Sequence, residues 1–160
     1  MEPVIPGKPV SFSRTEQVQI LTLNSINGFN RLFGGKLMEW IDVVAAVVAR
    51  RHSGRNVTTA AVDNLQFRAP AFANDTIILS GYITYAGRTS MEVCVKTYVE
   101  NLDGSRKPIN KAYLVLVALD DEGNPTPVPP VIPETELEKR EYMEAQKRRE
   151  FRKLRKAEHF

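Results

Sequence analysis

Two hydrophobic spacings divide the chain into helical and extended segments. Between residues 32 and 51, apolar side chains recur every three or four positions, at Leu37, Ile41, Val44, Val47 and Val48. This spacing is typical of an α-helix with one apolar face. Basic residues fill the expected last turn of this helix, and Gly54 follows as a stop signal. The pattern predicts one long helix that is largely covered by other elements.

Most of the remaining chain up to residue 119 alternates between apolar and polar residues, as strands do. The alternation predicts five strands, near residues 17–24, 57–67, 76–85, 91–99 and 112–119. The turn residues Gly87–Ser90 and Asn101–Gly104 separate the last three strands and are typical of hairpins. The last segment is apolar throughout, which favours a strand buried on both faces. This order predicts an α+β fold, with a curved antiparallel sheet wrapped around one long central helix.

Both ends of the chain differ from this body. Residues 1–16 contain three prolines and no sustained period, and they predict an extended lead-in. A proline-rich linker at 122–133 separates the body, at 10–121, from a highly charged tail at 134–160. In the tail, acidic residues precede basic ones, an order that complements a helix dipole. Its few apolar residues form no wide stripe, so we expect a solvated or lightly docked C-terminal helix. A contact with nucleic acid, a membrane surface or a partner is the alternative.

Composition narrows the possible functions. A length of 160 residues suits one domain with a substantial core. No apolar run approaches the roughly 20 residues of a membrane-spanning helix, and the first residues lack the features of a secretory signal, which predicts a cytoplasmic location. One cysteine, Cys94, and two histidines, His52 and His159, are too few for a metal centre. The net charge of +3 is too small to indicate nucleic-acid binding.

The most distinctive stretch runs from Asn27 to Asp42. A polar loop leads to Gly34 and Gly35 at the expected start of the helix. Unpaired backbone N–H groups and the positive end of the helix dipole point outward there, a position that can polarise a carbonyl oxygen. Asp42 places a carboxylate in an otherwise apolar part of the helix, where it must be paired, solvated or used in chemistry.

In these features the chain resembles the hotdog-fold acyl-CoA thioesterases of the acyl-CoA hydrolase family. The shared pattern consists, in order, of Asn27, Phe33-Gly34-Gly35, Asp42, Thr59, Asp63, Phe67, Pro70 and Asp75. The turn Gly87-Arg88-Thr89-Ser90 is similar to the family's glycine-threonine-serine turn. Three residues depart from the pattern. Asn30 and Arg31 stand where family members often have a glycine and a small or acidic residue, and Asn74 stands where a glycine is common. The resemblance covers residues 16–119 and implies a hotdog fold and hydrolysis of acyl-CoA.

The motif residues supply what thioester hydrolysis needs. The N–H groups near Gly34 and Gly35 would hold the thioester oxygen, Asp42 would activate water or attack directly, and Asn27 would position the water or the carbonyl. A thiolate leaves easily, so no strong acid catalyst is required.

Geometry predicts a second subunit at the site. Asp42 lies eight residues beyond Gly34, roughly 12 Å along a helix, so one chain cannot easily place both at one carbonyl. Two chains with antiparallel helices would form two composite sites. The resemblance implies the same arrangement, with Asn27 and Asp42 contributed by different chains, and further assembly into trimers of dimers, which are hexamers.

The substrate is expected to contact a second region. The phosphates of CoA favour cations at the mouth of the site, and Arg88 is the leading candidate. Pantetheine would receive hydrogen bonds from Thr59, Thr89 and Ser90, with Gly87 in the same turn. CoA is part of the substrate, so no separate cofactor is expected.

Less specific interpretations remain open. Asp42 could be a structural carboxylate, Asn27 a turn residue, and the glycine pair a packing device. A non-catalytic acyl-CoA-binding or regulatory module is therefore the alternative function. A hydratase is less favoured, because it would be expected to pair a histidine with a carboxylate and neither histidine has that setting.

Overall fold

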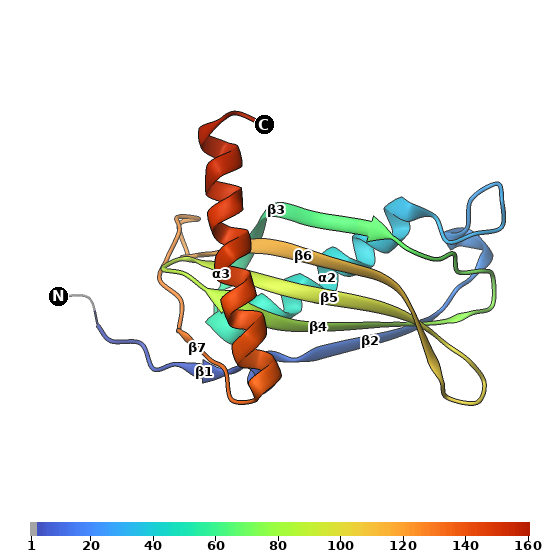
Figure 1. The fold of residues 1–160 in the computed structure, drawn as a ribbon, viewed down its shortest axis with the longest axis horizontal. Helices are drawn as coiled ribbons and strands as arrows, with labels where there is room; N and C mark the ends of the chain where they lie inside the picture. Colours follow the sequence, from blue (N-terminus) through green and yellow to red (C-terminus); the bar gives the residue numbers. More distant parts are fainter. Residues whose placement is uncertain (1–2) are drawn as a thin grey trace.

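A computed structural model describes residues 3–160 and contains one five-stranded antiparallel sheet. The strands lie in the order β2-β4-β5-β6-β3. Their bounds are Thr15–Ile20, Thr76–Ala86, Ser90–Glu100, Arg106–Leu119 and Asn56–Phe67 in that order. The long helix α2, Gly34–Ser53, packs along one face of this curved sheet (Figure 1). The predicted α+β architecture, a curved antiparallel sheet around one long helix, is confirmed.

Shorter elements lie at the two ends of the chain. Near the N-terminus, β1 spans Lys8–Pro9 and the one-turn helix α1 spans Val10–Ser13. The two-residue strand β7, Val131–Ile132, pairs with β1 in parallel. The 3₁₀ turn η1 covers Leu23–Ser25, directly after the first strand of the main sheet.

Two boundaries differ from the prediction. The lead-in contains a helical turn, and β2 ends at Ile20 because the next residue, Leu21, is buried and donates its N–H to the Asp75 carbonyl. Strand β6 begins at Arg106, before the apolar run, and includes Pro108 beside a register shift. A proline is tolerated at such an irregularity because a ladder hydrogen bond is already missing there. Residues 1 and 2 of the expected lead-in lie outside the described residues.

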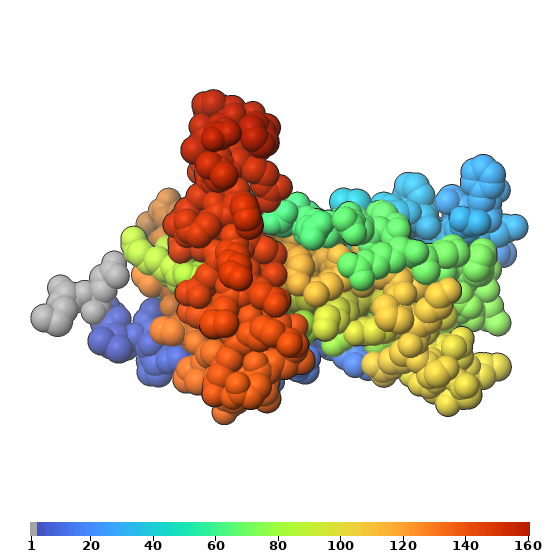
Figure 2. All heavy atoms as spheres, in the orientation of Figure 1, coloured from blue at the N-terminus to red at the C-terminus, as the bar shows by residue number. Residues whose placement is uncertain are grey.

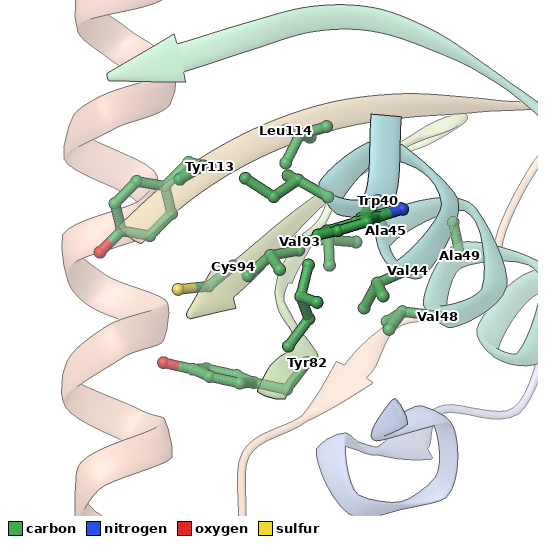
Figure 3. Packing of buried hydrophobic residues seen from close by; sticks show 14 of the residues in the cluster. Trp40, Val44, Ala45, Val48, Ala49, Tyr82, Val93, Cys94, Tyr113 and Leu114 are labelled. Carbon is green, nitrogen blue, oxygen red and sulfur yellow. The ribbon is translucent and has the colours of Figure 1, made fainter. Parts of the chain in front are cut away.

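The main core lies between α2 and the sheet. Side chains of α2 pack against β5 and β6, as Figure 3 shows for Trp40, Val44, Val48, Val93 and Leu114. The helix approaches the sheet closely at Gly81, where an added Cβ would lie 2.7 Å from a Val44 methyl carbon. This position therefore requires glycine, and the close approach fixes α2 relative to the strands.

The charged tail forms a helix, α3, Glu136–Ala157, that docks on the other face of the sheet. Successive side chains of a strand point to opposite faces, so Tyr82 points toward α3 while Gly81 faces α2, and the Tyr82 hydroxyl donates to Glu141 over 2.7 Å. Figure 2 shows α3 lying across this face. None of the helices in residues 3–160 combines the length and apolar character needed to cross a membrane.

Of the two predicted states of the tail, solvated or lightly docked, the structure shows docking: α3 lies on the sheet with most of its residues exposed, and charge pairs hold it there. The Glu92 side chain on β5 is 1% exposed and accepts hydrogen bonds from Arg148 and Arg152 over 2.7 and 2.8 Å. Asp63 on β3 pairs with Arg152 and Arg155. A buried carboxylate requires such partners, and a hydrophobic pattern does not reveal them.

The proline-rich segment also packs against the body. Val128 and Val131 are buried, and the Val128 N–H donates to the Arg88 carbonyl over 2.9 Å. His52, at the end of α2, is buried and its Nε2 lies 2.7 Å from the Pro129 carbonyl oxygen. This histidine therefore connects α2 to the segment, beyond the helix-end role expected from its position.

Candidate active site

The loop before α2 is organised by Asn27. Its side-chain Oδ1 accepts hydrogen bonds from the backbone N–H groups of Phe29 and Arg31, over 2.9 and 3.3 Å. This is the geometry of an asparagine turn, in which a side chain closes the loop. With the oxygen engaged, the side-chain amide N–H₂ is the group that can donate to a ligand.

The helix begins at Gly34, as the glycine pair predicts. Within residues 3–160 the backbone N–H groups of Gly34 and Gly35 have no hydrogen-bond acceptor, whereas those of Lys36 and Leu37 donate to the Phe33 carbonyl. A Cβ on Gly35 would lie 2.8 Å from the Phe33 ring, so a larger residue at this position requires the ring to move. Two unpaired donors thus face outward at the positive end of the helix.

A cavity of about 430 Å³ opens beside this helix start. Most of its lining is apolar, with two cations and the Asn27 amide; the residues are Asn27, Arg31, Leu32, Gly34, Leu37, Phe67, Arg68, Ala69, Pro70, Ala71 and Ile109. An apolar cavity with few polar groups is the usual form of a small-molecule site. The cavity can therefore hold an apolar group whose polar end meets the free N–H groups.

Asp42 lies two turns farther along α2, outside this cavity. Its Oδ1 accepts a hydrogen bond of 2.6 Å from the hydroxyl of Thr59 on β3. The two residues lie on a side of α2 that the sheet leaves uncovered, where Met38 and Val43 are 45% and 51% exposed. The helix is thus covered less completely than its apolar content predicted. A threonine hydroxyl that donates to a carboxylate fixes the orientation of its oxygens.

The β4–β5 turn carries the second predicted motif. The Gly87 N–H donates to the Ser90 carbonyl, and the Thr89 carbonyl accepts from Ala118 on β6. Ser90 is in register with Val117, which is in register with Thr58 of β3. Two strand spacings of roughly 4.8 Å place this turn about 10 Å from Thr58 across the sheet. The turn therefore lies level with the Thr59–Asp42 pair.

Comparison with known proteins places the chain in a family. Residues 29–103 match the model of the thioesterase superfamily. Staphylococcus aureus acyl-CoA hydrolase, solved with butyryl coenzyme A, superposes with a TM-score of 0.92 at 37% identity, covering 96% of this chain and 94% of that one. This chain belongs to the acyl-CoA hydrolase family of hotdog thioesterases.

Other members extend the comparison. An uncharacterized acyl-CoA thioester hydrolase of Bacillus subtilis is 46% identical over 113 residues, which are 70% of this chain and 66% of that protein. A hexameric acyl-CoA thioesterase, solved without ligand, gives a TM-score of 0.92 at 42% identity over 96% of this chain and 99% of that one. The chain spans only 25% and 40% of two longer mouse acyl-CoA thioesterases. Solved variants of the S. aureus enzyme replace an aspartate, an asparagine or a threonine with alanine.

The fold divides the predicted residues of this hotdog family member into two groups. Asn27 and Gly34 share the cavity, whereas Asp42 and Thr59 lie together outside it. By strand register, Gly87–Ser90 lie level with the second group along the sheet, and Ser90 lines a hollow beneath α3. One chain thus separates the predicted site residues into two groups, which are called half-sites below.

The Thr59–Asp42 contact is one that the sequence did not predict. Thr59 was expected to bind pantetheine, but in the structure it donates to Asp42, 17 residues away in the chain. The basic residues of α3 beside Ser90 were not predicted either, because the tail was expected to be solvated or only lightly docked. The interleaved lysines and arginines late in the tail were the available signal.

Cys94 is not a candidate nucleophile. Its side chain is buried beneath α3, between Tyr82 and Tyr113 (Figure 3), and burial raises the pKa of the thiol. A thiol kept protonated in this way is a poor nucleophile. In the described part of the chain, no group of three or more His, Cys, Asp or Glu side chains could hold a metal ion.

Proposed function

We propose that the chain is an acyl-CoA thioesterase, which hydrolyses an acyl-CoA to a carboxylate and free CoA. The observation that carries the proposal is the Thr59–Asp42 hydrogen bond of 2.6 Å, because it orients a carboxylate beside an open face of α2. The family's named activities support it, as do the S. aureus variants, whose substituted residue types are those of Asp42, Asn27 and Thr59.

In the proposed reaction, one half-site binds the thioester oxygen and the other activates the attacking water. The thioester oxygen accepts hydrogen bonds from the N–H groups at Gly34 and Gly35, which stabilise the developing negative charge. Asp42 accepts a proton from a water molecule, whose oxygen forms a bond to the acyl carbon. The carbon–sulfur bond then breaks, and the sulfur leaves as the CoA thiolate. The Asn27 amide donates to the attacking water or to the carbonyl. Direct attack by Asp42 is the alternative for the first step.

A dimer would bring the half-sites together. Strand β3 has a neighbour on one side only in the described sheet. Exposed apolar side chains lie on α2 and on this strand, namely Met38 and Val43 of α2 and Val62 of β3. Pairing of two copies along this edge would cover the apolar surface and place antiparallel helices side by side. We propose composite sites from Asp42 of one chain and Asn27 of its partner, with three such dimers in a hexamer.

The proposed substrate site includes residues of β3 and of the β4–β5 turn. Thr59, Gly87, Arg88, Thr89 and Ser90 would contact CoA, which brings its own reactive group and needs no cofactor. A cytoplasmic location is proposed, in agreement with the name of the cytosolic mouse relative.

The test is release of CoA thiol from short, medium and long acyl-CoAs. We expect the parent to hydrolyse at least one of them and Asp42→Asn to lose at least about 100-fold in kcat, since general bases contribute 10²–10⁴-fold. Glu39→Gln is the matched control, because Glu39 is an exposed carboxylate on the same helix, paired with Lys36. No turnover of any acyl-CoA, or full activity of Asp42→Asn, would contradict the proposal and favour a binding module.

A further inference from the structure

Helix α3 carries two parallel rows of basic side chains. The first row, Arg148, Arg152 and Arg155, follows an i, i+4, i+7 spacing and pairs with Glu92 and Asp63 on the sheet. The Arg148 and Arg152 side chains are only 19% and 17% exposed. This row fixes the rotation of α3 about its own axis.

The second row, Arg149, Lys153 and Lys156, has the same spacing, shifted by one position along the helix. Side chains at these positions share a face. The row lines a hollow of about 290 Å³ together with Arg152, Tyr85, Ser90, Met91, Glu92 and Val115. Figures 1 and 2 show the β4–β5 turn, in yellow-green, beside α3.

Arg149 is held against the turn that carries the substrate motif. An added Cβ on Gly87 would lie 3.4 Å from the Arg149 guanidinium, and Arg149 donates weakly to the Tyr85 hydroxyl over 3.4 Å. Because the ion pairs of the first row fix the position of α3, the backbone of Arg149 cannot move away from the turn. The cation is thus presented beside Gly87 and Ser90.

The hollow has more positive than negative charge. Its carboxylate, Glu92, is already bonded to two arginines. In residues 3–160 the second row has a single salt bridge, from Lys153 to the exposed Glu150 over 3.4 Å. Like charges gathered on one helix face repel, and an anion with several charges relieves this repulsion. The arrangement therefore favours a ligand that carries more than one phosphate.

We propose that Arg149, Lys153 and Lys156 bind the phosphates at the nucleotide end of CoA. The inference rests on the proposed function and extends its substrate site to α3. The hollow adjoins Ser90, whose turn lies about 10 Å from Thr58 across two strands. The next residue, Thr59, bonds Asp42 on the α2 face of the same sheet. CoA carries a diphosphate and a 3′-phosphate at the end opposite to its thiol. The tail helix then acts as part of the substrate site.

The test measures binding without turnover. Calorimetric titration of the full chain with CoA and with pantetheine, which lacks the nucleotide, is compared for the parent and for Lys153→Gln/Lys156→Gln. We expect the CoA Kd to rise about tenfold or more, because charge-assisted hydrogen bonds are lost, and pantetheine affinity to stay unchanged. Lys139→Gln/Arg140→Gln removes the same charge from the first turns of α3 and is expected to leave both affinities unchanged.

Three results would overturn the inference. These are an unchanged CoA Kd in the double variant, an equal loss in the control variant, and a loss for pantetheine as large as for CoA. Loss of affinity for a single-stranded oligonucleotide without loss for CoA would assign the row to nucleic acid instead. The thiol assay separates failure of this inference from failure of the proposed function. If the unmodified protein binds CoA through this row but hydrolyses no acyl-CoA, the proposed activity is contradicted and the binding site is not.

Discussion

At the scale of single residues, three asparagines of residues 3–160, Asn30, Asn64 and Asn74, occupy backbone conformations that most side chains avoid. Asn30 and Asn74 have φ values of 58° and 74°. In the family pattern that the sequence resembles, glycine is common at both positions. Asparagine is, after glycine, among the residues that best tolerate the left-handed region. These two departures from the family pattern therefore preserve the loop conformations around the cavity and before β4.

Thr59 gives a residue-scale prediction about the orientation of Asp42. Thr59→Val keeps the shape and removes the hydroxyl that donates to the carboxylate. We expect kcat for acyl-CoA to fall about tenfold or more, because a hydrogen bond to a charged group is worth about 1.5–3 kcal/mol. Thr59→Ser retains a donor and should recover most of the rate. A variant series with equal kcat values would show that the contact does not support catalysis.

His52 predicts how stability depends on pH. Its Nε2–H donates to Pro129 and its Nδ1 is buried without a partner, so protonation would bury an unpaired charge. Burial lowers the pKa of His52 below its ordinary value of about 6.5. The unfolded chain therefore binds the additional proton more readily, and the free energy of unfolding should fall as the pH drops below about 6.5.

Urea unfolding between pH 7.5 and 5 measures this dependence. His52→Gln, which can still donate to Pro129, should show a smaller loss of stability on acidification than the parent. His159→Gln is the control, because the other histidine of the chain is exposed near the C-terminus. Identical slopes for His52→Gln and the parent would exclude His52 as the source.

At the scale of elements, α3 is attached to the sheet by charge. Glu92 is buried on β5, and its carboxylate is compensated by two arginines of α3 and by the hydroxyl of Thr84. The guanidinium of Arg148 also lies 3.8 Å from the centre of the Tyr113 ring. These contacts take the place of the apolar stripe that docked helices usually have. The amphipathic pattern of α3 therefore did not predict how the helix docks on the sheet.

The element-scale prediction concerns loss of this compensation. Arg148→Met/Arg152→Met leaves Glu92 buried without a cation, and we expect the free energy of unfolding to fall by about 3 kcal/mol or more. Arg155→Met removes a half-exposed cation from the same row and should cost less than about 1 kcal/mol. Adding Glu92→Gln to the double variant should restore part of the lost free energy of unfolding. Chemical denaturation measures these stabilities. Equal stabilities of the double and Arg155→Met variants would contradict this account of docking.

At the scale of the whole molecule, the two half-sites predict a complementation experiment. Asp42→Asn and Asn27→Ala should each be inactive alone. After subunit exchange in equal amounts, half of the dimers contain one of each chain, and each of these has one intact composite site. We expect recovery of about a quarter of the parental rate. Sites built within one chain would give no recovery on mixing.

Much of this protein follows from local sequence. The periodicity of residues 32–119 determined the long helix and the hairpin-linked strands, because spacing along one element fixes which side chains share a face. The Asn27, Gly34 and Asp42 motif was likewise readable, since helix starts and their free N–H groups depend on neighbouring residues.

Contacts between elements were decided only by the tertiary structure. The bond from Thr59 to Asp42, the docking of α3 over Glu92, and the position of Arg149 beside Gly87 join segments that are 17 to 62 residues apart in sequence. No local period encodes which faces meet, because that depends on strand register and on the packing of α2 and α3 against opposite faces of one sheet.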